Sequence, residues 1–569
     1  MTQNTKAMDN ISFPAFNATV GDIEGNAQKI ISKYHKYEDD AALVVFPELC
    51  VTGYPLEDLL FRQQFLERTA QAVERITAQI GSVPCIIGAP VQHDDGIYNS
   101  ALVLQNGRVV AERQKVHLPN YDVFDEQRYF RAGSSSQPPV NVAGLTFALL
   151  ICEDTWFSNP LISQVRLGGQ FAISINASPW DATKVNKRRR VLEQRARESG
   201  VGIAYTNLIG GQDELVFDGG LLLAEPGYPV VREGGWIEDD ERSLALLQGQ
   251  DGPMLRKRTL GYESTGRRGH ELYEALKLGL RDYVRKNGFE RVVVGVSGGV
   301  DSALAATIAV QALGADSVLG IMMPTEYTTQ TSINLAVDLC QRLGIQYQEM
   351  GVQESYAGVL GALSPLFAGT DQGVAEENLQ ARIRGAMLMA VSNKMGHMVL
   401  STGNKSEMSV GYSTLYGDMV GGFNVLKDVY KTEVWELCNW INETESEPIP
   451  PSIISRPPSA ELAHDQRDTD SLPNYYDLDH ILCLMIEKEQ DVNAIYGQNG
   501  YERSTIERVR KLIDRNEYKR RQAPPGVRVS AKSLGGRDRR YPITNRYAES
   551  IDPELDNIQE WMQDEDGMA

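Results

Sequence analysis

Short apolar runs alternate with longer mixed stretches along the first half of the chain. The predicted strands of this half lie at 42–46, 85–88, 101–104, 147–152, 171–176 and 202–207. The predicted helices lie at 23–37, 64–80 and 185–199. Alternation of this kind indicates layers of helices packed on β-sheets, the α/β class.

The second half repeats the alternation. A helix is predicted over 269–286, where apolar residues recur near the 3.6-residue helical period. It leads into the valine-rich run 292–296, which predicts a short buried strand. Further strands are predicted at 318–323 and 398–401, with a helix at 332–343.

Four stretches lack such patterns. Residues 357–375 are predicted to form a loop, and the proline-rich stretch 447–473 is predicted to be an ordered or closing loop over a site of the second half. The acidic end, 551–569, is predicted to be a frayed helix. The charge-rich stretch 232–258 has no clear periodicity, so we predict two domains, 1–255 and 256–569.

Composition narrows the function classes. The 569 residues carry a formal charge of −20, which argues against nonspecific binding to nucleic acid or anionic membranes. Anionic ligands must then be held by local basic groups and metal. The six cysteines form no CxxC pair, and no run of 18 apolar residues occurs. A cytoplasmic protein without a disulfide framework is expected.

The valine-rich strand runs directly into a glycine turn and a helix start. Two adjacent glycines, Gly298 and Gly299, let several backbone N–H groups point into one concavity, and the helix N-terminus adds partial positive charge. Asp301 suits a phosphate site only if a divalent metal screens it. No Walker lysine follows the glycines. The predicted nucleotide-binding residues are Gly295, Val296, Ser297, Gly298, Gly299, Val300, Asp301 and Ser302.

This strand–SGGVDS–helix segment resembles the pyrophosphate-binding loop of the ATP pyrophosphatase superfamily. The superfamily includes NAD synthetase, GMP synthetase, asparagine synthetase and argininosuccinate synthetase. The resemblance implies a Rossmann-like parallel sheet and cleavage of ATP between its α- and β-phosphates. It does not name the acceptor.

Three reactive side chains stand at predicted strand ends in the first half: Glu48, Lys115 and Cys152. The carboxylate could accept the thiol proton, the ammonium could stabilise thiolate and oxyanion, and the thiol could attack an amide carbonyl. Each residue taken singly has an ordinary structural explanation. Together they predict an amide-cleaving site.

The segments around these residues resemble the nitrilase family of carbon–nitrogen hydrolases. FPEL surrounds Glu48, K-x-x-LPNY begins at Lys115, and ICED-x-W surrounds Cys152. The resemblance implies an αββα sandwich and a thioester formed with loss of ammonia. Likeness to the glutamine-using branch implies that the substrate's amino-acid end is held by Tyr121, Ser178 and Lys184. The basic run 186–190 is predicted to be a solvated helix face.

Further candidates lie in the second half. On a helix, Asn378, Arg382 and Gly385 would share one side, where arginine could grip phosphates. Thr402 and Glu407 follow a predicted strand, on the usual ligand side of a parallel sheet. Glu407 could share magnesium with Asp301. Lys427 and Lys431 are candidates for neutralising the charge that moves on the phosphates during the reaction.

The segments ENLQARIRG, STGNKSE and LYGD resemble NAD synthetase more selectively than the glycine loop does. That likeness implies that Asn378, Glu407 and Lys519 contact deamido-NAD and that Thr402 contacts ATP. Over residues 11–545 the chain resembles the glutamine-dependent NAD⁺ synthetases. The implied products are NAD⁺, AMP, pyrophosphate and glutamate, and the implied metal is Mg²⁺. A sheltered ammonia path and a homo-oligomer, at least a dimer through the second half, are expected.

Two alternatives remain open from the sequence. A GMP-synthetase-like enzyme would carry a G-x-C-x-G nucleophile, and asparagine synthetase an N-terminal cysteine, neither of which occurs here. In a different class, the first half would be a non-catalytic docking module, with free ammonia as the nitrogen donor. Nitrogen-source assays on a Cys152 variant separate these possibilities.

Overall fold

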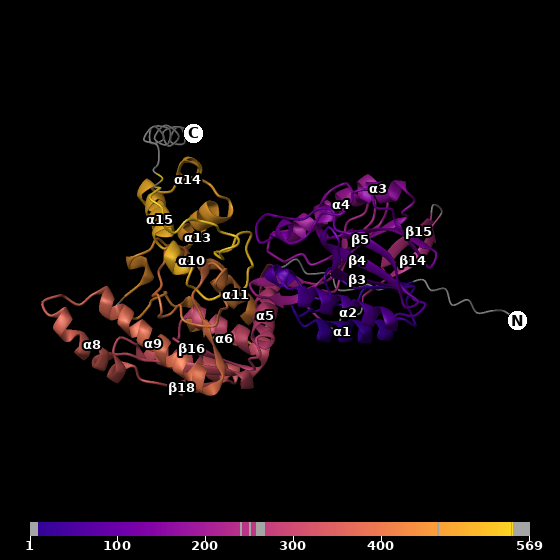
Figure 1. Ribbon diagram of the computed structural model, residues 1–569. Helices are drawn as coiled ribbons and strands as arrows, with labels where there is room; N and C mark the ends of the chain where they lie inside the picture. The colour runs from indigo at the N-terminus through magenta and orange to yellow at the C-terminus, as the bar shows by residue number, and fades with distance from the viewer. Residues whose placement is uncertain are drawn as a thin grey trace. The chain divides into compact units, whose positions relative to one another are not determined.

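The computed structural model describes residues 10–238, 242–249, 252–257, 268–463, 466–547 and 549 (Figure 1). The chain forms two compact units, Met1–His270 and Glu271–Ala569. The boundary predicted between residues 255 and 256 falls inside strand β15 (Gly252–Lys257), which pairs with β14 (Ser243–Gly249) of the first unit. The predicted frayed helix at 551–569 lies outside the described residues.

The first unit contains two large sheets packed face to face. Across the seven-stranded sheet the order is β15, β14, β1 (Asn10–Ser12), β2 (Leu43–Val45), β3 (Cys85–His93), β4 (Gly96–Gln105) and β5 (Arg108–Gln114). Across the six-stranded sheet it is β13 (Val231–Glu233), β12 (Leu221–Ala224), β9 (Ile203–Asn207), β8 (Phe171–Asn176), β7 (Leu145–Ile151) and β6 (Val140–Val142). A separate hairpin joins β10 (Ile209–Gln212) to β11 (Leu215–Asp218).

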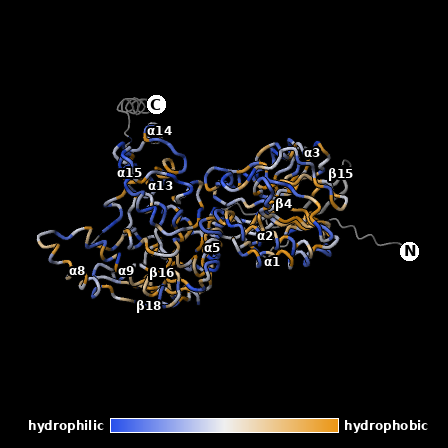
Figure 2. Tube along the Cα trace, in the orientation of Figure 1, coloured by the Kyte–Doolittle hydropathy of each residue, from blue (hydrophilic) through white to orange (hydrophobic). Residues whose placement is uncertain are grey.

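Alternating side chains of the two sheets form the central core. Val45 and Val103 of the seven-stranded sheet belong to the same buried cluster as Leu149, Ile173 and Leu223 of the other sheet. Figure 2 shows the strongest hydrophobic colouring of this unit along its strands. Because both faces of the central strands are covered, they appear in the sequence as continuous apolar runs.

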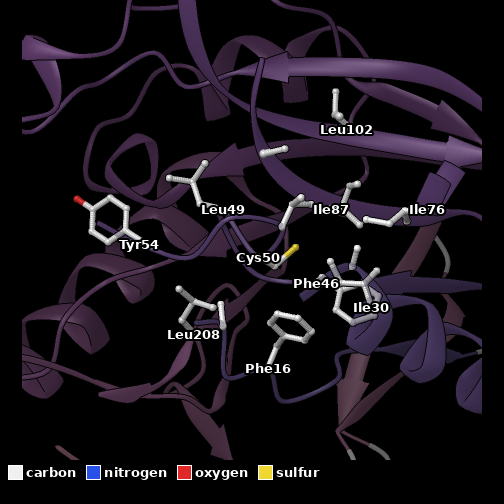
Figure 3. Packing of buried hydrophobic residues seen from close by; sticks show 14 of the residues in the cluster. Phe16, Ile30, Phe46, Leu49, Cys50, Tyr54, Ile76, Ile87, Leu102 and Leu208 are labelled. Atoms are coloured by element: carbon white, nitrogen blue, oxygen red, sulfur yellow. The ribbon is translucent and has the colours of Figure 1, made fainter. Parts of the chain in front are cut away.

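Helices cover the outer faces of both sheets. One outer layer consists of α1 (Ile23–Tyr37) and α2 (Gln63–Gln79), and the other of α3 (Leu161–Arg166) and α4 (Lys184–Ser199). Helix α1 starts where the Asp22 side chain accepts a hydrogen bond from the Gly25 amide, and it buries Ile30 against the sheet. In Figure 3 the Cys50 side chain lies among this apolar layer, near Phe16 and Phe46. The αββα sandwich implied by the sequence is therefore confirmed.

The second unit is built on a parallel five-stranded sheet. Its order is β18 (Gln346–Glu349), β17 (Val318–Met322), β16 (Arg291–Gly295), β19 (His397–Ser401) and β20 (Phe423–Asn424). From β16 the chain winds outward to β17 and β18, then crosses back to β19. The carboxyl ends of β16 and β19 therefore meet at a topological switch point, where parallel sheets bind ligands. The predicted Rossmann-like sheet is confirmed.

Two helical layers and a helical bundle complete this unit. The helices around the sheet are α5 (Arg268–Lys286), α6 (Val300–Leu313), α7 (Gln330–Leu343), α8 (Gln353–Phe367), α9 (Val374–Met395) and α11 (Lys431–Thr444). The bundle contains α10 (Lys405–Val410), α13 (Tyr475–Leu482), α14 (Val492–Asn499), α15 (Arg503–Arg515) and α16 (Glu517–Arg520), and a π-helical turn spans Cys483–Glu487. Figure 1 shows α8 at the edge of the sheet layer and α15 in the bundle.

Two predicted irregular stretches contain helices. The predicted loop at 357–375 is wrong over most of its length, because α8 extends to Phe367 and α9 begins at Val374. Small residues and Pro365 favour a loop in this stretch, but the helix continues past Pro365 to Phe367. The proline-rich stretch 447–473 contains the short helix α12 (Pro451–Ser455) and a 3-10 turn at Asp468–Asp470.

Candidate active sites

The first candidate site centres on a buried lysine between two carboxylates. Lys115 Nζ lies 2.8 Å from Glu48 Oε1 and 2.8 Å from Glu126 Oε1. Glu48 Oε1 also accepts from Asn99 Nδ2 at 2.8 Å, and its Oε2 accepts from the Ala177 amide at 2.7 Å. Burial would lower the pKa of Lys115, but Glu126 and Glu48 outweigh it and raise that pKa. The ammonium is therefore held charged.

Cys152 follows directly on β7, the strand that brings it to this cluster. Its φ of +47° is a left-handed conformation that non-glycine residues seldom adopt, and such strain is concentrated at functional positions. Burial raises the pKa of its thiol, the charge of Glu48 raises it further, and Lys115 opposes both. The thiol is thus protonated at rest and needs a base, which Glu48 can supply.

Asp154 connects the nucleophile turn to the lysine segment. Its Oδ1 accepts from the amides of Val116 and His117 at 3.0 and 2.8 Å, and its Oδ2 accepts from the Ile151 amide at 3.3 Å. Burial raises the pKa of Asp154 to about 7. One side chain thereby ties the two residues after Lys115 to the residue before Cys152.

Glu48→Gln separates thiol acidity from turnover. Removing the negative charge should lower the pKa of the Cys152 thiol, while loss of the base should reduce amide cleavage by about 10²–10⁴-fold. The pH dependence of Cys152 alkylation by iodoacetamide, followed by peptide mass spectrometry, measures the thiol pKa. Lys115→Met should move the same curve to higher pH. A curve that Glu48→Gln leaves in place would contradict the proximity of the two charges.

The residues predicted to hold the substrate's amino-acid end come from three segments. Tyr121 is 46% exposed, and its hydroxyl donates to Glu153 Oε1 at 2.9 Å. Ser178 is buried just after β8. Lys184, in the first turn of α4, places its ammonium 5.1 Å from the ring centroid of Phe124. Ser178 and Lys184 carry hydrogen-bond donors, which suit a carboxylate, whereas the Tyr121 proton is engaged by Glu153 and its oxygen is left as an acceptor for an ammonium group.

Two buried charged side chains of this unit, Glu126 and Arg188, have no distinguishing signal in the sequence. Glu126 lies in an acidic stretch where no pattern separates it from its neighbours, and burial raises its pKa to about 7. The predicted solvated helix face at 186–190 is wrong for Arg188, because this residue is 3% exposed and paired with Asp218. Arg188 differs from its basic neighbours only because it lies on the side of α4 that faces the sheet.

The second candidate site begins at the glycine loop between β16 and α6. The Ser297 amide donates to Ser302 Oγ at 3.2 Å, and the Gly299 amide donates to Ser297 Oγ at 3.2 Å. Gly298 adopts φ +78°, and a Cβ there would lie 2.4 Å from the carbonyl oxygen of Ser332. The loop packs directly on the start of α7 and requires glycine at this position.

Gly298→Ala should displace this loop. Because the added methyl group collides with backbone, NAD⁺-forming activity should fall about 10–100-fold, as expected when reacting groups are misplaced by about 1 Å. Gly344→Ala is the matched control, since Gly344 is left-handed at φ +66° but has nothing within 4 Å of an added Cβ. The control should lose about 1 kcal/mol of unfolding free energy from the positive φ, while Gly298→Ala should lose more because of the collision, and only Gly298→Ala should lose activity. Steady-state kinetics and thermal unfolding distinguish the two effects.

Acidic and basic groups converge beyond the ends of β16 and β19. Asp301 Oδ2 lies 2.5 Å from Lys431 Nζ, and Glu407 Oε1 lies 3.4 Å from the same nitrogen. Asn404 Nδ2 donates to Asp301 Oδ1 at 2.9 Å. Burial raises the pKa of Glu407 to about 8, with Lys431 opposing and Asp301 adding to the rise. The carboxylates of Asp301 and Glu407 thus both contact the ammonium group of Lys431.

This donor set fits a magnesium ion that arrives with phosphates. Magnesium in nucleotide sites commonly takes one or two carboxylates and completes its shell with phosphate oxygens and water. Asp301 and Glu407 supply two hard oxygen donors that already converge on one positive charge. Among the described residues, no group of three acidic, histidine or cysteine side chains could form a protein-only metal site.

The residues predicted to contact deamido-NAD lie on or beside α10. Glu407 belongs to α10, and the loop that follows it is contacted by the other two. Asn378 Oδ1 accepts from Thr414 Oγ1 at 2.7 Å, and Lys519 Nζ donates to the carbonyls of Gly411 and Ser413 at 2.8 Å each. Burial lowers the pKa of Lys519. Thr402, predicted to contact ATP, is half-buried directly after β19.

Of the remaining predicted groups, one contacts this loop directly. Arg382 Nε donates to the Leu415 carbonyl at 3.1 Å. Lys427 is buried. Lys405, which was not predicted, is fully buried and lies 2.8 Å from Glu487 and 3.0 Å from Asp428. These ion pairs join the first residue of α10 to Asp428 and to the π-helical turn that contains Glu487.

Part of the proline-rich stretch contacts Ser332, in the first turn of α7. Arg456 Nη1 donates to Ser332 Oγ at 2.6 Å, and Arg456 Nη2 lies 2.7 Å from Glu461 Oε1. Glu461 accepts from Ser332 Oγ at 2.7 Å. Ser332 is the residue whose carbonyl packs on Gly298. The stretch predicted to close over the site thus contacts the side chain of the residue whose carbonyl packs on the glycine loop.

Comparison with known proteins identifies both units. Residues 13–245 match the carbon–nitrogen hydrolase family, and residues 272–523 match the NAD synthase family. The glutamine-dependent NAD(+) synthetase of Xanthomonas campestris is 43% identical over 551 residues, covering 95% of this chain and 98% of that protein. The enzyme of the same name from Thermotoga maritima is 40% identical over 578 residues, covering 95% and 99%.

A solved structure agrees over the same length. The glutamine-dependent NAD⁺ synthetase of Acinetobacter baumannii, solved in complex with ADP, has a TM-score of 0.74 and 38% identity to this chain. The match covers 94% of this chain and 98% of that one. Of the helices that the structure describes, none has the length and apolar character needed to cross a bilayer.

Proposed function

The chain belongs to the family of glutamine-dependent NAD⁺ synthetases, and we propose that Cys152 of its first unit releases the ammonia with which its second unit amidates deamido-NAD. The protein is a ligase that forms NAD⁺ with glutamine as nitrogen source and ATP as co-substrate. The observation that carries the assignment of roles is the buried Glu48–Lys115 pair, 2.8 Å apart, acting on Cys152.

In the first unit, Glu48 takes the thiol proton and Cys152 Sγ attacks the side-chain amide carbon of glutamine. Lys115 is a buried ammonium, and two of its three N–H groups contact carboxylates. The third N–H group can stabilise the negative charge that develops on the substrate oxygen. Glu48 returns the proton to the leaving nitrogen, so that ammonia departs and a thioester remains. Water then hydrolyses the thioester to glutamate and restores the thiol.

In the second unit, the nicotinate carboxylate of deamido-NAD attacks the α-phosphorus of ATP and pyrophosphate leaves. Ammonia then attacks the acyl carbon of the adenylate, and AMP leaves to give NAD⁺. The glycine loop and the N-terminus of α6 support phosphate binding. Asp301 and Glu407 would hold Mg²⁺, which would offset phosphate charge when bound. Lys431 and Lys519 supply the neighbouring positive charge.

Ammonia transfer between the sites should be sheltered from solvent. Free ammonia is mostly protonated near neutral pH and an ammonium ion cannot attack the adenylate, so exchange with solvent would waste the glutamine consumed. The alternative of a non-catalytic first unit is not favoured by the buried, charge-paired environment of Cys152. That environment has no evident use in a docking module.

We also propose a homo-oligomer that forms through the second unit. Helix α8 has an apolar sequence but buries only Tyr356, while Val359 is 41% and Leu366 is 79% exposed. Such a face is suited to covering by a second copy. The cytoplasmic location expected from the sequence stays a prediction.

A product assay tests the proposed function. Purified protein with ATP, Mg²⁺, glutamine and deamido-NAD should yield NAD⁺, AMP, pyrophosphate and glutamate in equal amounts. Omission of deamido-NAD or ATP should abolish NAD⁺ and AMP formation together. Formation of ADP and phosphate in place of AMP and pyrophosphate would contradict the acyl-adenylate route.

A further inference from the structure

A buried arginine joins two elements of the first unit behind Ser178. Arg188 of α4 donates from Nη1 to both carboxylate oxygens of Asp218, at 2.8 and 3.0 Å. From Nη2 it donates to the carbonyl oxygens of Ser178 and Pro179 at 2.8 and 3.1 Å. The same nitrogen donates to Ser178 Oγ at 3.3 Å. Arg188 therefore holds the Ser178–Pro179 segment against the last residue of β11.

Asn207 closes the network from β9. Its Oδ1 accepts from the Ser178 amide at 2.8 Å, and its Nδ2 donates to the Ser178 carbonyl at 2.9 Å and to Asp218 Oδ1 at 3.1 Å. Burial would raise the pKa of Asp218, but Arg188 and Arg232 outweigh it and lower that pKa. Asp218 thus stays ionised, and the buried charges compensate one another.

This network determines what Ser178 can offer a ligand. Its backbone N–H and C=O are both occupied within the protein, and its hydroxyl oxygen already accepts from Arg188. A hydroxyl carries one proton, which Ser178 can donate to the neighbouring Tyr205 oxygen or to a bound substrate. Arg188 occupies one of the two lone pairs of the Ser178 hydroxyl oxygen, and its positive charge directs the hydroxyl proton away from the guanidinium, so Ser178 is oriented to donate to substrate. Lys184 begins the same helix, and its ammonium is a donor only.

We propose that Arg188 is a positioning residue that sets Ser178 as a hydrogen-bond donor and so makes the glutamine subsite selective for an α-carboxylate. The proposal rests on the proposed function of the first unit. A carboxylate offers acceptors alone, which match both donors. An α-carboxamide brings two N–H donors that the Lys184 ammonium cannot accept and that meet a Ser178 oxygen already engaged by the Arg188 cation, and it lacks the charge that attracts Lys184. The selectivity arises from an arginine that itself does not touch substrate.

The test compares L-glutamine with L-glutaminamide, its neutral α-amide, in the full-length protein. Arg188→Gln should lower kcat/KM for glutamine by about 10–100-fold, chiefly through KM, and for the α-amide by less than about 3-fold. Arg190→Gln, at an exposed position of the same helix, is the matched control and should change neither. Ammonia-driven NAD⁺ synthesis should stay unchanged in both variants.

A double-mutant cycle tests whether Arg188 acts through Ser178. In a Ser178→Ala background, Arg188→Gln should lower kcat/KM for glutamine by less than about 2-fold more, because the group it orients is gone. Equal losses for glutamine and its α-amide, or additive losses in the cycle, would overturn the proposal in favour of a structural role. Unchanged kinetics in Arg188→Gln would overturn it as well.

Two further comparisons keep the test interpretable. If Arg188→Gln does not fold, Arg188→Lys takes its place in the test. Lysine retains a buried charge opposite Asp218 but cannot reach Asp218, Ser178 and Pro179 together, so the same loss of substrate discrimination is expected. Wild-type protein that makes NAD⁺ from ammonia but not from glutamine would refute the proposed function of the first unit instead. The two failures are thus distinct.

Discussion

Cys152→Ala should abolish glutamine-driven NAD⁺ synthesis and leave ammonia-driven synthesis within about 2-fold of wild type. Removal of a covalent nucleophile costs about 10³-fold or more, because the remaining site cannot form the thioester. Lys115 and Glu48 keep their 2.8 Å contact without the thiol, so the fold of the first unit should be retained. Steady-state NAD⁺ formation with each nitrogen source measures the effect.

Cys483→Ala is the control for this substitution. Cys483 is half-buried in the second unit and should tolerate alanine with both nitrogen sources. Unchanged use of glutamine by Cys152→Ala would remove the catalytic assignment of the first unit. Equal loss with glutamine and ammonia would mean that Cys152 supports the structure of the whole protein instead.

Asp301→Asn should abolish NAD⁺ synthesis from both nitrogen sources. Asparagine keeps the shape of the side chain and can still accept from Asn404, but it removes the charge that contacts Lys431 and would contact Mg²⁺. Loss of such an electrostatic group costs about 10²–10³-fold in rate. Glutamate release by the first unit should continue, and its measurement beside NAD⁺ formation separates the two activities.

The matched control is Asp316→Asn. Asp316 is an exposed acid in the short turn between α6 and β17, so its loss should change neither activity. If Asp301→Asn retained NAD⁺ synthesis at wild-type Mg²⁺ concentrations, the assignment of Asp301 to the metal and phosphate region would be contradicted. Restored activity at higher Mg²⁺ would agree with it.

The reactive residues could be predicted because they stand where apolar strands end. Cys152 and Glu48 each follow a buried run, and the meeting of Asp301 with Glu407 follows from parallel strands that share a carboxyl edge. Their partners could not be predicted in the same way. Glu126 reaches Lys115 from a short 3-10 turn, Glu126–Arg128, whose position depends on the surrounding fold.

The edges of the fold were the least predictable part. Strands β14 and β15 lie in a charge-rich stretch, and β14 is fixed by antiparallel pairing with the distant three-residue strand β1. Helix α8 consists of small and apolar residues and buries little within the chain, so no amphipathic pattern marks it. Arg188 could not be predicted from the basic run that contains it, because only its burial distinguishes it from Arg190.

Nitrogen tracing tests the central claim most directly. The reaction is run with glutamine labelled with ¹⁵N at the side-chain amide, in the presence of unlabelled ammonium, and the carboxamide nitrogen of the NAD⁺ formed is analysed by mass spectrometry. Nitrogen released at Cys152 and used within the same protein predicts NAD⁺ that is predominantly ¹⁵N-labelled, and label that disappears in Cys152→Ala. Unlabelled NAD⁺ from the wild-type protein would contradict the account.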